Sequence, residues 1–186
     1  MAESGKIWYK LRGALIVPFY IFPIFYQQGS CKGDASVLIA GAAVFALGWG
    51  LRIWAQMHLH YRLKAHKKLT LTGPYLYVRN PIYIGNTLIL AGFTSLTGLV
   101  WFVPFMVLAC AFTYHMTVLY EEKHLTNKYG QGYVEFLGRI PRWLPNFKGT
   151  EAAERYDVKP YFVQSIIAEL HILVLLLPLL YLYLYR

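Results

Sequence analysis

The stretch that decides the fold is LTLTGPYLYVRNPIYIG, at residues 69–85. It is polar, aromatic and interrupted by Gly and Pro. A stretch of the same character, YEEKHLTNKYGQGYVEFLGRIPRWLP, occupies residues 120–145. The segments around both are apolar enough to lie in a lipid bilayer. A membrane protein of this size therefore keeps most of its polar chemistry in these two stretches, which we name the first and the second motif block.

The composition indicates a membrane protein rather than a water-soluble one. Of the 186 residues, 57% are hydrophobic and 15% are charged, and the mean hydropathy is +0.39. The length corresponds to a single domain, residues 1–186. The apolar residues form runs that approach the roughly 20 residues that a spanning helix needs. We expect an all-α, polytopic transmembrane helical bundle of about five spans, at residues 11–26, 36–57, 82–97, 99–120 and 161–185.

Two of these segments are unusual for spanning helices. Segment 11–26 contains Pro18 and Pro23, and segment 82–97 is short and contains Gly85 and Gly92. Pro removes a backbone donor inside a helix, although protein or water can satisfy the freed backbone groups in a bundle. We expect these two segments to be tilted, kinked or incompletely spanning.

The distribution of charge predicts the orientation in the membrane. With these spans, all Lys and Arg residues except Lys32, Arg52 and Arg186 fall on or beside the face that receives the N-terminus and both motif blocks. Cytoplasmic loops carry an excess of Lys and Arg, so we expect the N-terminus and the motif blocks on the cytoplasmic side. The net charge of +9 then reflects a basic surface beside anionic lipid headgroups, and we expect no nucleic-acid partner.

Gly and Pro mark the helix boundaries inside the motif blocks. Gly73-Pro74 interrupts the extension of segment 36–57, and Asn80-Pro81 has the composition of a helix start. In the second block, a helix should continue through residues 121–128 and stop near Gly130. A further turn or two is expected over residues 133–137.

Side chains in the motif blocks suit polar ligands. Arg79, beside the helix start at Asn80, suits an anionic group such as a carboxylate or phosphate. An interfacial aromatic belt with a snorkelling Arg is an equal alternative. Glu121 and Glu122 suit an ammonium group or a ribose hydroxyl, with a solvated helix end as the alternative. Arg139 and Arg142 flank Pro141, and an Arg there suits an anionic headgroup or substrate, or membrane anchoring alone.

Three further features of the sequence have a functional and a structural interpretation. Gly85 leaves room for a ligand or for another helix to approach closely. Glu169 lies inside the last span, where an ionisable residue is a functional hypothesis, and the alternative is a structural pairing with Arg52. Glu121-x-x-His124 resembles half of a di-iron carboxylate pair, but such a site needs the motif twice. We expect no metal site.

The two motif blocks together resemble a known superfamily. Gly73-Pro74-Tyr75-x-x-Val78-Arg79-Asn80-Pro81-x-Tyr83-x-Gly85 is similar to the core signature of the isoprenylcysteine carboxyl methyltransferases and phospholipid methyltransferases. So is Glu121-Glu122-x-x-Leu125 with Tyr129-Gly130-x-x-Tyr133, ending at Arg139-x-Pro141. The resemblance covers a motif-bearing core of residues 51–145 and leaves the expected C-terminal span at 161–185 outside.

This resemblance implies a multi-pass membrane methyltransferase that uses S-adenosylmethionine at the cytoplasmic face on a lipophilic acceptor from the bilayer. It implies catalytic roles for Arg139, near the acceptor, and for Glu122. If an amine is methylated, Glu122 or Glu169 would accept its proton. The family commonly has His where this chain has Asn80, which cannot titrate near neutral pH. The implied cofactor-binding residues are His66, Leu69, Tyr75, Arg79, Asn80, Pro81, Tyr83, Gly85, Glu121 and Glu122.

Three functional hypotheses remain at this point. The preferred one is methylation of a prenylcysteine-like carboxylate or a phospholipid headgroup, with membrane lipids and a lipophilic substrate as partners. The second is a sterol-reductase-like NADPH enzyme on a related scaffold. The third is a non-catalytic membrane protein that retains the scaffold.

Overall fold

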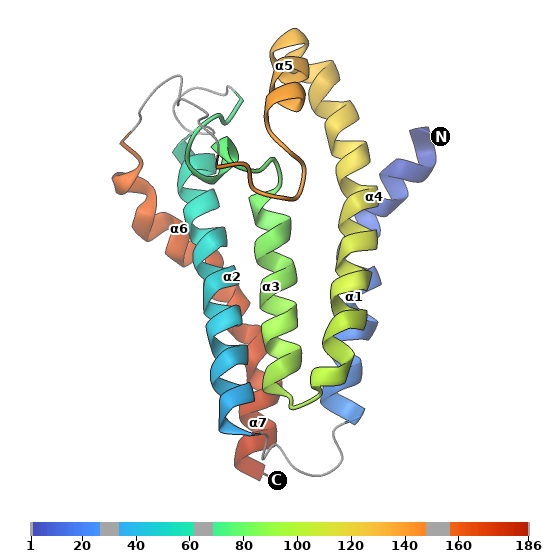
Figure 1. The fold of residues 1–186 in the computed structure, drawn as a ribbon, viewed down its shortest axis with the longest axis vertical. Helices are drawn as coiled ribbons and strands as arrows, with labels where there is room; N and C mark the ends of the chain where they lie inside the picture. Colours follow the sequence, from blue (N-terminus) through green and yellow to red (C-terminus); the bar gives the residue numbers. More distant parts are fainter. Residues whose placement is uncertain (1, 27–33, 62–68, 148–156, 186) are drawn as a thin grey trace.

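The computed structural model describes residues 2–26, 34–61, 69–147 and 157–185. Within these ranges the regular structure is helical (Figure 1). The long helices are α1 (Ala2–Tyr26), α2 (Ala35–Tyr61), α3 (Pro81–Leu96) and α4 (Val103–Tyr129), and α5 (Gln131–Arg139) follows α4. The C-terminal arm consists of α6 (Phe162–Glu169), the 3₁₀ segment η5 (Leu170–Leu176) and α7 (Leu177–Tyr185), and the shorter 3₁₀ segments are η2 (Gly73–Leu76), η3 (Val100–Phe102) and η4 (Lys159–Tyr161).

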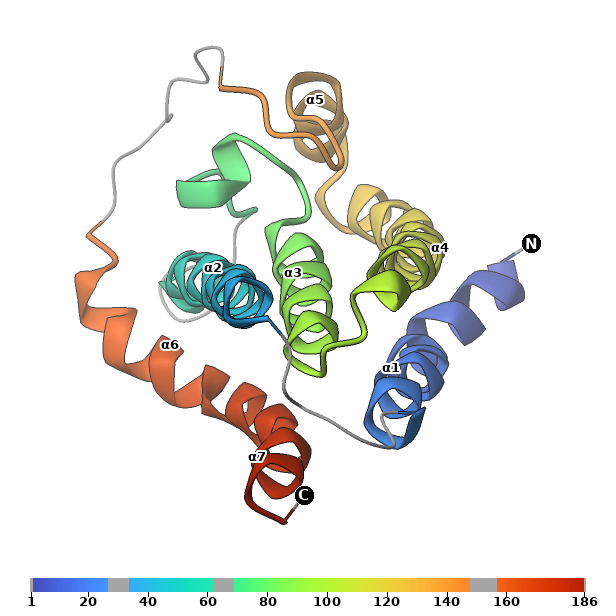
Figure 2. The ribbon, with the colours of Figure 1, turned by 60° about the horizontal axis from the view of Figure 1, so that its bottom comes forward.

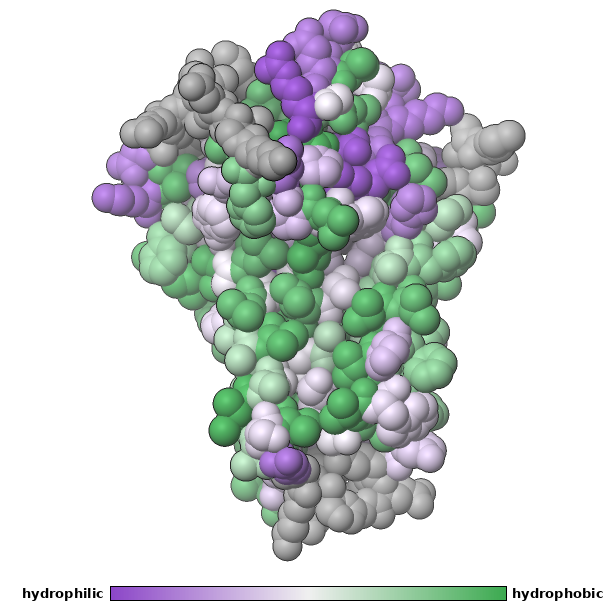
Figure 3. Space-filling model, viewed as in Figure 1, coloured by the Kyte–Doolittle hydropathy of each residue, from purple (hydrophilic) through white to green (hydrophobic). Residues whose placement is uncertain are grey.

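The expected transmembrane helical bundle is confirmed. In the described ranges, four helical segments are long and apolar enough to cross a membrane, and α3 is a shorter apolar helix between two of them. Hydrophobic side chains cover the visible face along most of the bundle, whereas hydrophilic ones gather at the end that carries α5 (Figure 3). The four long segments are Lys6–Tyr26, Ala35–His60, Val100–Tyr129 and Lys159–Tyr181.

The two unusual segments behave differently from each other. The first forms one continuous helix, α1, which contains both Pro18 and Pro23. The second, α3, has 16 residues and lies in the middle of the bundle, beside α2 and α4 (Figure 2). α1 packs mainly on α4, and α6 packs on α2. The core of the bundle is therefore α2 and α3, with the other helices around them.

Glycines allow α2 and α3 to lie in close contact. A Cβ atom added at Gly48 would lie 2.7 Å from the carbonyl oxygen of Gly85, and one added at Gly85 would lie 2.8 Å from that of Gly48. Gly92 is equally close to α2, since its Cβ would lie 2.5 Å from the backbone nitrogen of Phe45. Real side chains do not approach backbone atoms this closely, so these positions accept Gly alone at this helix separation.

A buried ion pair attaches the C-terminal arm to the core. Arg52 on α2 donates two hydrogen bonds to the carboxylate of Glu169 on α6, at 2.6 and 3.0 Å. The same guanidinium contacts the side-chain oxygen of Asn86 on α3, and Trp49 donates to the backbone carbonyl of Glu169. Glu169 is 1% exposed. The structural pairing of Arg52 with Glu169, one of the two alternatives from the sequence, is confirmed.

The helices in the motif blocks begin and end next to the Gly and Pro residues that the sequence predicts as boundaries. The chain breaks at η2, where Gly73 has a φ of 59°, and α3 begins at Pro81. Asn80 precedes that helix without a side-chain cap hydrogen bond, and its amide donates to the carbonyl oxygen of Arg142 instead. In the second block, α4 ends at Gly130, whose φ of 59° turns the chain into α5.

Candidate active site

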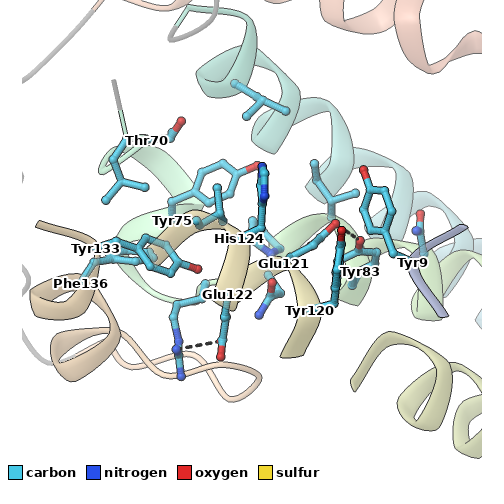
Figure 4. Close-up of a pocket in the computed structure, with 18 of the residues that line it drawn as sticks. Tyr9, Thr70, Tyr75, Tyr83, Tyr120, Glu121, Glu122, His124, Tyr133 and Phe136 are labelled. Atoms are coloured by element: carbon cyan, nitrogen blue, oxygen red, sulfur yellow. Dashed lines mark hydrogen bonds and ion pairs between the residues drawn. The ribbon is translucent and has the colours of Figure 1, made fainter. Parts of the chain in front are cut away.

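The polar end of the bundle contains a cavity of about 710 Å³. This volume lies within the roughly 300–1,000 Å³ of typical small-molecule sites. Residues from both motif blocks and from α1 and α2 form its wall, and Figure 4 shows several of them pointing into one space. The lining residues are Tyr9, Arg12, Arg52, Leu59, Leu69, Thr70, Tyr75, Arg79, Asn80, Pro81, Ile82, Tyr83, Asn86, Tyr120, Glu121, Glu122, His124, Leu125, Tyr133 and Phe136.

Backbone hydrogen bonds join the two motif blocks next to the cavity. The backbone N–H of Arg79 donates to the carbonyl oxygen of Pro141 at 2.9 Å, and the N–H of Asn146 donates to that of Tyr77 at 2.9 Å. The Asn80 side chain adds a third link at 3.2 Å, to the carbonyl oxygen of Arg142. The segment after α5 therefore lies along the segment before α3, although the two are distant in sequence.

Glu122 lies between two arginines at the rim of the cavity. Its carboxylate contacts Arg79 Nη1 at 2.8 Å and accepts two hydrogen bonds from Arg142, at 3.0 and 2.6 Å. The hydrogen bond to Glu122 raises the pKa of the Arg142 guanidinium above its usual value. All three side chains are largely buried, so this arrangement has an ordered geometry. We name it the rim cluster.

Glu121, the neighbour of Glu122, has a different partner. Tyr83 Oη donates to Glu121 Oε1 at 2.7 Å, and the Tyr83 ring stacks on Tyr114 with ring centroids 4.7 Å apart. Consecutive residues on a helix point in different directions, so Glu121 lies toward α1 and α3 while Glu122 lies toward the loops. Figure 4 shows Glu121 beside Tyr83 and Glu122 at a separate ion pair. The two carboxylates thus occupy different parts of one cavity.

Two buried polar atoms on the cavity wall have no hydrogen-bond partner in the described part of the chain. They are Thr70 Oγ1 and Arg79 Nε. Buried polar atoms are nearly always satisfied, so these two are candidates for contact with a bound ligand. Tyr133 and Phe136 line the same cavity, and their ring centroids are 5.7 Å apart. Burial, assisted by the Glu122 carboxylate, raises the pKa of Tyr133 to about 12, so its hydroxyl keeps its proton at neutral pH.

Most of the residues assigned to the cofactor from the sequence come together around this cavity. Their roles stay predictions. His66 lies outside the described residues. Two assignments do not fit the geometry. Gly85 does not line the cavity, because its missing side chain is used for packing against Gly48. The assigned residues that do line it are Leu69, Tyr75, Arg79, Asn80, Pro81, Tyr83, Glu121 and Glu122.

Arg139 is the second assignment that does not fit. It is exposed at the end of α5 and does not line the cavity, whereas Arg142 reaches Glu122. The reason is the extended backbone after α5: Ile140 ends the helix and is buried with Tyr133 and Phe136, which turns the following residues back toward α3. The arginine that approaches the site is therefore three positions later than the sequence pattern indicated.

Some residues that line the cavity carry no signal in the motif blocks. Tyr9 and Arg12 come from α1, and Arg52 and Asn86 come from the faces of α2 and α3 that meet below the cavity. Asn86 follows Tyr83 by one helical turn. This spacing is the feature of the sequence that indicates Asn86 as a residue of the site. In the described ranges, no three or more His, Cys, Asp or Glu side chains gather as a metal site.

Comparisons with known proteins agree with the architecture. The sequence profile of the phospholipid methyltransferase family matches residues 31–132, so it includes the first block and ends before Arg139. The nickel-cobalt-cadmium resistance protein NccN of Alcaligenes xylosoxydans xylosoxydans is 25% identical over 125 residues, which are 67% of this chain and 57% of that protein. The cobalt-zinc-cadmium resistance protein CzcN of Cupriavidus metallidurans is 26% identical over 134 residues, 70% of this chain and 61% of that protein.

This chain therefore spans about three fifths of the length of these two relatives. No solved structure matches the chain. The family match covers more than half of the 186 residues and includes α2, α3, α4 and the cavity residues they carry. The chain belongs to the phospholipid methyltransferase family.

Proposed function

We propose that this protein transfers a methyl group from S-adenosylmethionine to a lipophilic acceptor at the cytoplasmic face of a membrane. One observation carries the proposal. The two motif blocks surround a single cavity in which Thr70 Oγ1 and Arg79 Nε are buried without a partner in the described part of the chain. Family membership supports the reaction class.

The residues of the cavity fit the cofactor's chemical groups. Arg79 and Asn80 suit its carboxylate, because both present N–H donors beside the start of α3. Glu121 suits its ammonium group, since it is a carboxylate that lines the cavity and its Oε1 accepts from Tyr83. The aromatic side chains of Tyr75, Tyr133 and Phe136 suit the apolar face of an adenine ring. The cofactor, when bound, supplies an electrophilic methyl group on a sulfonium.

The protein's own contribution is alignment and the exclusion of water. Both oxygens of Glu122 accept hydrogen bonds from guanidinium groups, so this carboxylate holds Arg79 and Arg142 at the rim. We therefore assign Glu122 the positioning of Arg79 and not proton removal. A carboxylate acceptor needs no base.

The membrane orientation of the site follows from charge. The polar end of the bundle carries both motif blocks, α5 and the first turns of α1, where Lys and Arg concentrate. Short loops with this composition stay in the cytoplasm. The cavity also borders helices that are long and apolar enough to cross a membrane, so an acceptor dissolved in the bilayer has a short path to it.

Binding of S-adenosylmethionine to the purified protein in detergent tests the proposal. Isothermal titration should show one site, and Arg79→Ala or Glu121→Ala should weaken binding by about tenfold, the loss of one charge-assisted contact. Arg139→Ala is the matched control, because it removes an exposed guanidinium outside the cavity. Unchanged binding in both site variants contradicts the assignment.

Transfer of a labelled methyl group into total membrane lipid then tests the reaction. A labelled product identifies the acceptor. Stoichiometric binding without transfer to any lipid fraction would favour a non-catalytic protein. A thermal shift with NADPH, and none with S-adenosylmethionine, would favour the sterol-reductase-like alternative.

A further inference from the structure

Three arginines line the cavity, and they differ in their partners. Arg52 is paired with Glu169, and Arg79 is paired with Glu122. Arg12, on α1, has no carboxylate within 4.0 Å among the described residues. The lining thus contains one guanidinium whose charge is not matched by a direct protein contact.

The position of Arg12 is nevertheless ordered. Its Nη1 donates to the carbonyl oxygen of Tyr9 at 3.0 Å, and its guanidinium carbon lies 4.2 Å from the centre of the Tyr9 ring. The Tyr9 ring in turn contacts Tyr120 of α4, with centroids 5.6 Å apart. A guanidinium has five N–H donors, so this arrangement holds the group in place and leaves several donors available.

Arg12 lies beside both the cavity and the apolar part of α1. It is in the first turns of the segment Lys6–Tyr26, which is apolar enough to cross a membrane. The carboxylate that faces the same part of the cavity is Glu121, which interacts with Arg12 at longer range and is hydrogen-bonded by Tyr83. Arg12 also lies outside residues 31–132, the part that matches the family.

We propose that Arg12 and Tyr9 form an acceptor subsite that binds an amphiphile through its anionic group, a carboxylate or a phosphate monoester. The inference rests on the proposed function. It adds that α1 selects the acceptor, while the motif blocks hold the cofactor beside Glu121. A guanidinium that is fixed on an aromatic ring and borders apolar helices suits an anion with a long hydrocarbon tail.

Displacement of radiolabelled palmitate from the purified protein tests this subsite. The competitors are hexadecyl phosphate, hexadecanol and hexadecylamine, which share one chain length and differ in charge. Palmitate or hexadecyl phosphate should bind at least about tenfold more tightly than the uncharged and the cationic probes. The stronger of the two anions distinguishes a carboxylate from a phosphate subsite. Failure of both anions to bind, or equal binding of hexadecanol, overturns the proposal.

Variants of α1 test the residue. Arg12→Gln should lower the affinity for the preferred anion by about tenfold, and Arg12→Lys, which keeps the charge, should lose less. Lys10→Gln is the matched control, because it removes an exposed charge from the same helix and does not line the cavity. An equal loss in Lys10→Gln and Arg12→Gln shows attraction by surface charge alone and overturns the subsite.

Cofactor titration of the same samples separates the two proposals. Arg12→Gln should bind S-adenosylmethionine as the wild type does, and a parallel loss would make Arg12 a cofactor ligand and overturn the acceptor role. If the wild type binds an anionic probe through Arg12 but no S-adenosylmethionine, the proposed function fails and the anion subsite stands.

Discussion

Two arginine–glutamate clusters in this protein look alike in geometry and differ in what they hold together. The rim cluster joins Glu122 to Arg79 and Arg142, and all three come from the motif blocks. The intramembrane cluster joins Arg52 to Glu169 and Asn86, from three different helices. Exposure separates them further: the Glu169 side chain is 1% exposed, and that of Arg142 is 27% exposed.

This comparison indicates two uses of the same chemistry. In the intramembrane cluster, the side chains of Arg52 and Glu169 are 10% and 1% exposed, so each charge depends on the other, and the pair attaches α6 to α2. In the rim cluster, Glu122 has two cationic partners and one of them is partly hydrated, so loss of a single contact is tolerated. The first cluster should therefore determine stability, and the second should determine ligand binding.

The largest expected effect comes from breaking the intramembrane cluster. Glu169→Ala leaves the guanidinium of Arg52 buried without its counter-charge, which should lower the free energy of unfolding by about 3–5 kcal/mol. Denaturation in mixed detergent micelles measures this loss. The double variant Arg52→Met/Glu169→Leu removes both charges and should recover most of it. A Glu169→Ala protein as stable as the wild type would show that the pair contributes nothing.

The glycine contact between α2 and α3 tests the core on which both clusters depend. Gly85→Ala brings a methyl group within 2.8 Å of the Gly48 carbonyl oxygen and 2.7 Å of Arg52 Cγ. The helices must separate, at a cost of about 1–3 kcal/mol in the same denaturation assay. Gly50→Ala is the control, since a Cβ there meets no atom within 4 Å, and it should be neutral or stabilising. Equal behaviour of the two variants would contradict close helix contact at Gly85.

The rim cluster should show a smaller effect, on binding and not on stability. Arg142→Ala removes two hydrogen bonds to Glu122 and leaves Arg79 in contact. We expect a loss of about three- to tenfold in affinity for S-adenosylmethionine and little change in unfolding. Arg139→Ala, three residues earlier, should change neither. A greater loss in Arg139→Ala than in Arg142→Ala would restore the assignment made from the sequence.

The smallest effect is a pH dependence near the rim cluster. Burial and the Glu122 carboxylate raise the pKa of Tyr133 from 10 to about 12 in the folded protein. The protonated Tyr133 hydroxyl contributes fully to the free energy of unfolding below pH 10, and this contribution is lost as pH rises toward 12. Tyr133→Phe should therefore lose less stability than the wild type between these values. Identical alkaline unfolding of the variant and the wild type would contradict the shift.

Local patterns in the sequence predicted the helices and their ends. Apolar runs of sufficient length produced the spans, and Gly73, Pro81 and Gly130 mark boundaries that the structure retains. These features depend on residues within a few positions of one another, because helix breaks follow from local backbone geometry. The pairing of Arg52 with Glu169 was one of two alternatives, since an intramembrane charge needs a partner.

The site was predicted in part. Eight of the residues assigned to the site from the sequence line the cavity, but Gly85 and Arg139 do not line it. Gly85 was ambiguous because the lack of a side chain serves a ligand and a neighbouring helix equally well. Arg139 was chosen over Arg142 although the two differ by only three positions, and the turn after Ile140 decides between them.

The sequence by itself determined a helical membrane protein with two polar blocks between its spans, because hydrophobicity and helix breaking are properties of short segments. Only the tertiary structure decided which side chains share the cavity. Arg12, Arg52 and Asn86 meet the motif blocks there although they lie outside both blocks. Contacts between distant segments depend on how whole helices pack, and here Gly48 and Gly85 set that packing.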